Sequence, residues 1–161
     1  MSRAFTKEDA QHEGVMVVAR APLPHGVDNL VTPRGLALLH EEEVDMRTEL
    51  ERARAAGDEE RLVAELEGAL DELVYRIARA VVVDPAANDK TVVRFGDHVT
   101  VRPVTGGAAF TLTIVGVDEA EPEEGLVSFG APIAVGLLGH RVGDRVPQGI
   151  GGREVEILAI E

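Results

Sequence analysis

Two rows of apolar residues, separated by a Gly-Asp pair, constrain this chain of 161 residues more than any other feature. The spacing within each row alternates between three and four residues, which is the a/d pattern of a coiled-coil seam. The first row is Leu36, Leu39, Met46, Leu50 and Ala53, with Glu43 interrupting it, and the second is Leu62, Leu66, Ala69, Leu73, Ile77 and Ala80. Because so short a connection forces neighbouring helices to lie antiparallel, residues 32–83 predict a helical hairpin.

The ends of both helices carry recognisable signals. Thr32-Pro33 is a favourable start, since threonine can cap free N–H groups and proline fits the first helical turn. Gly57 closes the first helix. Asp58 is expected to cap the second, with Glu59 and Glu60 in its first turn near the positive end of the helix dipole. Each arm is then roughly 35 Å long.

A second unit is expected after a linker at residues 84–89. Alternating β-branched residues and glycine pairs predict strands at residues 92–101, 109–117, 126–129 and 154–160, with another entered at 142–146. Residues 132–138 predict a short helix. Residues 90–161 therefore predict an α+β domain with a mainly antiparallel sheet. Residues 1–31 are interpreted as a partly disordered leader, in which the apolar run at 15–18 either adds an edge strand or stays disordered.

The composition excludes several classes of function. Sixteen basic against twenty-nine acidic residues give a formal charge of −13, which argues against binding to duplex DNA or to an anionic membrane. The chain has no cysteine, which excludes thiolate catalysis and fits a cytoplasmic protein. The five histidines lack metal-ligand spacing, so we expect no metal site of the chain's own. The chain as a whole is not interpreted as an enzyme. The acidic stretch at residues 118–124 is interpreted as a solvated loop, with contact to a basic partner as the alternative.

Several segments of the C-terminal half form one recognisable series. They are Phe95-Gly96, Val99-Thr100-Val101, Ile114 to Ala120, Pro132-Ile133-Ala134, Leu137-Leu138-Gly139, Val142-Gly143-Asp144, Gly151-Gly152 and Glu154. In their order and spacing these segments resemble the bacterial Gre transcript-cleavage factors. In the N-terminal half, Ala4 to Asp9, Pro22-Leu23-Pro24, Gly26, Asn29, Thr32-Pro33 and Gly35 are similar to the B-type members. The resemblance covers nearly the whole chain.

The resemblance implies an FKBP-like C-terminal domain that docks on RNA polymerase at the rim of its secondary channel, with the coiled coil pointing down the channel. It assigns docking to the loop and short helix that contain Gly130, Ala131, Pro132, Ile133 and Leu137. In cleaving members, a tip of the form Gly-Asp-x-x-Glu-Asn supplies two carboxylates that help to hold a second Mg²⁺. Any Mg²⁺ is thus shared with the polymerase active site, whose oxygen-rich two-metal chemistry suits carboxylates.

This chain departs from that tip. Gly57-Asp58 is kept, but Arg61 and Leu62 stand where the family has Glu and Asn. The hairpin also aligns as shorter than the family's by about two turns per arm, or roughly 10 Å. Gly130 and Ala131 likewise replace an acidic or amide residue and a serine.

We therefore interpret the chain as a monomeric Gre homologue that presents Asp58, Glu59 and Glu60 to the channel and inhibits transcription with little cleavage. A true cleavage factor is one alternative. A regulator of nucleoside diphosphate kinase, which has the same architecture with a short hairpin, is another. Prolyl isomerase activity is not expected, since its aromatic-lined pocket is hard to build from four Phe and one Tyr.

Overall fold

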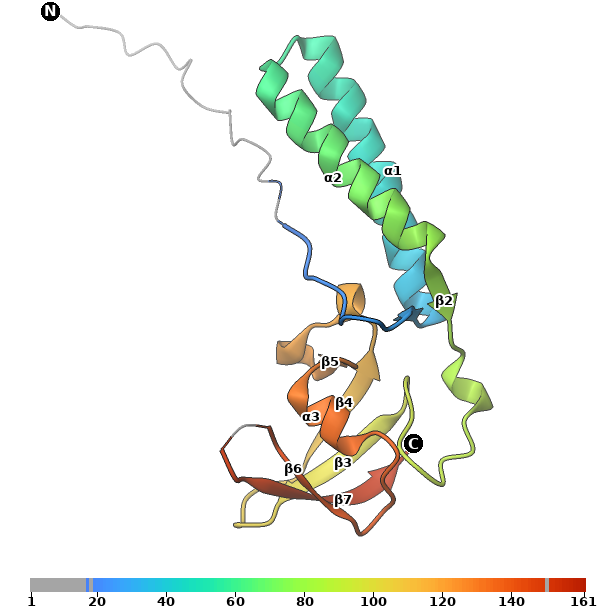
Figure 1. Ribbon diagram of the computed structural model, residues 1–161, viewed down its shortest axis with the longest axis vertical. Helices are drawn as coiled ribbons and strands as arrows, with labels where there is room; N and C mark the ends of the chain where they lie inside the picture. The colour runs from blue at the N-terminus through green and yellow to red at the C-terminus, as the bar shows by residue number, and fades with distance from the viewer. Residues whose placement is uncertain (1–16, 18, 150) are drawn as a thin grey trace, which may run out of the picture.

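A long helical hairpin projects from a compact sheet domain in the computed structural model, which describes residues 17, 19–149 and 151–161 (Figure 1). The two parts follow one another in the chain as the sequence predicts, so the α+β fold class is confirmed. The leader motif at residues 4–9, and Val15, Met16 and Val18, lie outside the described residues. Among the described residues, no helix combines the length and the apolar character that crossing a membrane requires.

The hairpin consists of α1 (Pro33–Ala56) and α2 (Glu60–Ala78). Thr32 caps α1, its side-chain oxygen accepting from the Gly35 amide at 2.9 Å. Gly57 ends α1 with a φ of 71°, a left-handed conformation that glycine adopts without a Cβ clash. The predicted N-cap of α2, Asp58, was wrong by one residue. Its N-cap is Glu59, and within the described chain no side chain caps that terminus.

The predicted seam holds the two helices together. Its buried members are Leu39, Leu50, Ala53, Leu66, Leu70 and Leu73. Leu70 takes the place that the pattern gave to Ala69, which is only half-buried. The difference arises because a straight helix has 3.6 residues per turn and drifts against a strict alternation of three and four. Burying each leucine contributes about 1.5–3 kcal/mol.

A short parallel strand pair closes the base of the hairpin. β1 (Asn29–Val31) pairs with β2 (Ala80–Val82), with Leu30 opposite Val81. The sequence analysis placed residues 29–31 in the leader and extended the helical row to Ala80. In the structure the helix ends at Ala78, because the β-branched residues that follow can pair with the strand that precedes α1.

Within the described residues the C-terminal domain is a five-stranded sheet in the order β5-β4-β3-β7-β6. Its strands are β3 (His98–Pro103), β4 (Phe110–Val115), β5 (Leu126–Ser128), β6 (Arg145–Pro147) and β7 (Glu154–Ile160). The sheet is mixed rather than purely antiparallel, since β4 and β5 run parallel. Helix α3 (Pro132–Leu137) packs on a core that includes Val99, Ile114 and Ile157.

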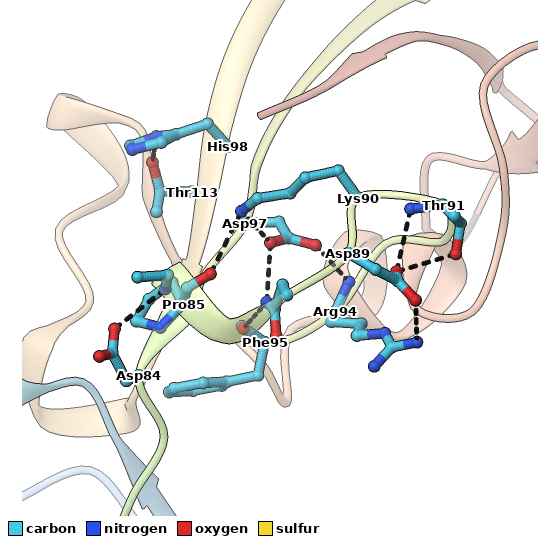
Figure 2. A network of polar contacts seen from close by, with 12 residues as sticks. Asp84, Pro85, Asp89, Lys90, Thr91, Arg94, Phe95, Asp97, His98 and Thr113 are labelled. Carbon is cyan, nitrogen blue, oxygen red and sulfur yellow. Dashed lines mark hydrogen bonds and ion pairs between the residues drawn. The ribbon is translucent and has the colours of Figure 1, made fainter.

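The stretch before β3 is a tethered loop, although residues 92–97 were predicted as strand. Asp97 is fully buried and accepts from the Lys90 ammonium at 2.7 Å, the Asn88 amide at 2.8 Å and the Arg94 backbone N–H at 2.8 Å (Figure 2). These bonds require a turn, which Gly96 provides with a φ of 88°. The linker, including the 3₁₀ turn η1 (Pro85–Ala87), is thereby held against the sheet domain.

Candidate functional site

The three predicted acids lie at the tip of the hairpin, in the turn between α1 and α2 and at the start of α2. Asp58 is partly exposed, and its carboxylate lies 3.9 Å from the Arg52 guanidinium, while Glu59 and Glu60 are exposed. In the part of the chain that the structure describes, no three acidic, histidine or cysteine side chains gather closely enough to hold a metal ion. The tip can therefore supply anionic ligands to a metal held elsewhere, but it does not form a cage of its own.

Arg61 adds a positive charge to the first turn of α2. Its side chain is 78 % exposed and donates to Glu65, one turn further on, at 3.0 Å. On the other arm, Arg52 bonds to Glu49, and this bond lowers the pKa of the Glu49 carboxyl. The tip thus presents three carboxylates and an exposed guanidinium that is paired with Glu65.

The predicted docking residues are divided between surface and core. Gly130 and Pro132 are exposed, and Ala131 and Ile133 are half-buried. Leu137, by contrast, is fully buried in the sheet domain, so it can support α3 but cannot touch a partner.

The structure gives a physical reason for the glycine in the docking loop. A Cβ at Gly130 would lie 2.7 Å from the side chain of Pro24, which belongs to the leader. Any larger residue at this position would push the leader away. A further exposed apolar side chain on α3 is Val135, which is 60 % exposed.

A third group of residues, which we call the joint, connects the hairpin base to the sheet domain. The turn η2 (Val117–Glu119) directs Asp118 at two arginines: Arg76 at the end of α2 and Arg20 in the leader, each donating at 2.9 Å. Arg76 is only 5 % exposed and also donates to the Ala21 carbonyl. Burial works to lower the pKa of Arg20, but its bonds to Glu42 and Asp118 outweigh burial and raise that pKa.

Glu119 completes the joint on the other arm of the hairpin. Its carboxylate accepts from the Thr32 hydroxyl at 2.6 Å and from the Arg34 guanidinium at 3.0 Å. Gly35 permits this approach, since a Cβ there would lie 2.7 Å from the Glu119 carboxylate. The same threonine that caps α1 is therefore also bonded to the sheet domain.

The interpretation of residues 118–124 as a solvated loop was wrong for its first two members. Asp118 and Glu119 are buried against the hairpin, whereas residues 121–124 are exposed. A run of acids looks solvated in a sequence because their buried guanidinium partners lie 42 to 98 residues away along the chain. The available signal was the Asp-Glu pair directly after a buried strand.

Comparison with known proteins identifies the class. The family model "Transcription elongation factor, GreA/GreB, C-term" matches residues 88–161. Transcription elongation factor GreA of Bacillus cytotoxicus is 38 % identical over 109 residues, which is 66 % of this chain and 67 % of the relative. The GreA of Nitratiruptor sp. is 33 % identical over 133 residues, 76 % of this chain and 81 % of the relative.

Solved structures of the same kind are also similar. The GreA factor homolog 1 (Gfh1) of Thermus thermophilus matches with a TM-score of 0.38 and 23 % identity, covering 84 % of this chain and 99 % of the other. GreA/GreB from Nitrosomonas europaea gives 0.40 and 23 %, covering 83 % and 98 %.

The sequence matches show that the protein is a Gre-type transcription elongation factor. The chain belongs to the GreA/GreB family.

Proposed function

We propose that this protein binds RNA polymerase at the rim of the secondary channel through its C-terminal domain and places the hairpin tip in the channel. There it inhibits RNA synthesis and stimulates little transcript cleavage. It acts as a monomer in the cytoplasm, has no catalytic centre or metal of its own, and does not bind duplex DNA. Any Mg²⁺ near Asp58, Glu59 and Glu60 belongs to the polymerase active site.

The observation that carries this proposal is the orientation of Arg61. It stands where the resemblance expects the second metal-binding carboxylate, and its guanidinium is exposed and turned back toward Glu65. A cation at this point repels a metal ion, and the remaining acids lie at other angles around the helix. Since a catalytic ligand must be held to within about 0.5 Å, displaced acids are poor substitutes. Acids that cannot complete a metal site can still perturb a neighbouring Mg²⁺ or block the path of nucleotides.

The experiment uses stalled, backtracked elongation complexes of the cognate polymerase with radiolabelled RNA. We expect the protein to slow elongation and to compete with a cleaving Gre factor without releasing short 3′ fragments. Fragments that increase with added protein would instead assign it to the cleaving members. A pull-down that recovers a nucleoside diphosphate kinase and no polymerase would refute the docking partner.

Two variants separate the tip from the docking surface. Replacing Asp58, Glu59 and Glu60 together by Lys should leave binding comparable and abolish inhibition, because only the channel-facing charge is changed. The matched control replaces the exposed acids Glu121, Glu123 and Glu124 by Lys, which changes the net charge equally but leaves the tip intact. Equal inhibition by the tip variant and the wild type would refute the tip mechanism.

A further inference from the structure

The described leader is fixed against the joint before it enters the hairpin. Arg20 donates to Asp118 at 2.9 Å, and Arg76 donates to the backbone carbonyl of Ala21. The leader then turns at Gly26, whose φ is 70°, and enters β1. Figure 1 shows this segment, in blue, passing over the upper end of the sheet domain on its way to the hairpin. The leader is therefore held at both ends, and the part between them has a defined place.

The middle of the leader lies on the proposed docking loop. A Cβ added to Gly130 would lie 2.7 Å from Cγ and 3.8 Å from Cβ of Pro24, while the Ser128 hydroxyl oxygen would be at 3.7 Å. Pro24 thus occupies the space in which a side chain of residue 130 would stand. Pro24 is itself only half-buried, as is its neighbour Leu23. One side of the proline ring therefore covers the loop, and the rest of it stays at the surface.

The leader and the loop bring two uncharged stretches together. Asp, Glu, Lys and Arg make up 28 % of the chain, but none of them occurs in residues 21–27 or in residues 125–140. The exposed loop residues Gly130 and Pro132 carry no polar side-chain atom. Binding by such a surface gains nothing from ion pairs, so its favourable free energy comes from apolar area that is removed from water. The partner surface that fits it is apolar and uncharged.

We propose that Pro24 belongs to the surface that docks on RNA polymerase, and that the leader and the loop together contact one apolar patch of the polymerase. The inference rests on the proposed docking through the C-terminal domain. The polymerase is favoured as the occupant because the ring of Pro24 is continuous with the loop to which docking is assigned. Pro22 and Pro24 also restrict the backbone dihedral φ, so the leader loses little conformational entropy on binding. Pro24 thereby supplies the side chain that Gly130 lacks.

The test measures the affinity of the full-length protein for the cognate core polymerase by biolayer interferometry. Pro24→Asp should weaken binding by at least about ten-fold, because it places a charge without a partner in an apolar contact. The matched control is His25→Asp, which adds the same charge at the next residue, also exposed, and should change the affinity by less than about two-fold. Pro132→Asp, in the loop itself, should weaken binding as Pro24→Asp does.

The outcomes separate this inference from the proposed function. Wild-type protein that does not bind the polymerase would overturn both. If Pro132→Asp weakens binding and Pro24→Asp does not, the docking loop stands and the inference alone is overturned. Weaker binding by Pro24→Asp with normal binding by Pro132→Asp would assign the contact to the leader alone and overturn the shared surface. Loss of a dimer, rather than of polymerase binding, in Pro24→Asp would assign the patch to a second copy of the chain and also overturn the inference.

A second pair of variants distinguishes direct contact by Pro24 from a purely structural role. The backbone at Gly130 is not left-handed, so Gly130→Ala fits the loop, but its Cβ would meet the Pro24 ring at 2.7 Å and displace the leader. We expect binding to weaken by about three-fold or more. Adding Pro24→Ala removes Cγ and leaves Cβ at 3.8 Å, which relieves the clash without restoring the ring. The double variant should therefore stay as weak. Recovery to the wild-type affinity, or unchanged binding by Gly130→Ala alone, would overturn the inference.

Discussion

Asp118→Asn is the substitution that should weaken the joint most for the smallest change in shape. Asp118 accepts from Arg76 and Arg20, each at 2.9 Å, and the Asp118 and Arg76 side chains are 8 % and 5 % exposed. An asparagine keeps the volume but removes the negative charge and can turn an amide donor toward a guanidinium. Removing one partner of a buried pair costs about 3–5 kcal/mol, because the other charge stays buried without compensation. Arg20 retains Glu42, and Arg76 retains the Ala21 carbonyl and lies 3.9 Å from the Glu72 carboxylate, so we expect the lower end, about 3 kcal/mol.

The assay is urea unfolding of the full chain followed by far-ultraviolet circular dichroism, which reports mainly on α1 and α2. In a parallel thermal melt, the midpoint temperature of unfolding should fall by roughly 6–12 °C, since 1 kcal/mol shifts it by about 2–4 °C in a chain of this length. The control is Glu121→Gln, an exposed acid three residues further on, for which we expect a change within about 0.5 kcal/mol.

A double-mutant cycle decides whether the pair itself is responsible. Arg76→Met alone should also cost about 3 kcal/mol, because it leaves Asp118 with one partner fewer in a buried place. Combined with Asp118→Asn, the loss should fall short of the sum by about 1.5 kcal/mol or more, since both substitutions remove the same interaction. A coupling below about 0.5 kcal/mol would refute the reasoning and show that the joint depends on packing instead.

Four further substitutions test the fold around the site. Gly57→Ala should destabilise the hairpin by about 1 kcal/mol, because the backbone φ at this position is 71°. Gly68→Ala, in the middle of α2, should stabilise the hairpin by a similar amount. The thermal unfolding midpoints of the two variants should therefore shift in opposite directions. Leu66→Ala should cost about 2.7–5 kcal/mol in urea unfolding through the cavity left in the seam, and a loss under about 1 kcal/mol would contradict its burial. Gly96→Ala would bring a Cβ to 2.4 Å from the Pro85 ring, so hydrogen exchange should show residues 84–90 losing protection; unchanged protection would mean that the linker is held by other contacts.

The hairpin was predictable because its signals are local. A coiled-coil row, a threonine cap and a closing glycine each depend on neighbours within one or two helical turns, and the structure places α1 and α2 within a few residues of the expected ends. The boundaries within the sheet domain were harder. Val92 and Val93 have the composition of a strand, but the bonds that Asp97 accepts hold the preceding segment in a turn.

The Asp-Glu pair after a buried strand is a signal that these acids are buried, but their partners in the joint could not be predicted from the pattern of residues. Asp118 reaches Arg76 and Arg20 across 42 and 98 residues of sequence, and neither the spacing nor the composition of any one segment encodes such a meeting. Asp58, Glu59 and Glu60 lie at the turn between α1 and α2, because a glycine between two helical rows fixes where the chain reverses. Asp58 lies beside the Arg52 guanidinium and Arg61 is bonded to Glu65, and a sequence does not specify these side-chain contacts.

The parallel pairing of β1 and β2 has a consequence for how this architecture varies. The strands that enter and leave the hairpin are paired side by side, so the segment between Thr32 and Arg79 is an insertion whose two ends are already fixed. Adding or deleting one heptad in each arm changes the length of the hairpin by about 10 Å, while the β1–β2 pair and the sheet domain keep their hydrogen bonds. The length of the hairpin can therefore change during evolution independently of the C-terminal sheet domain.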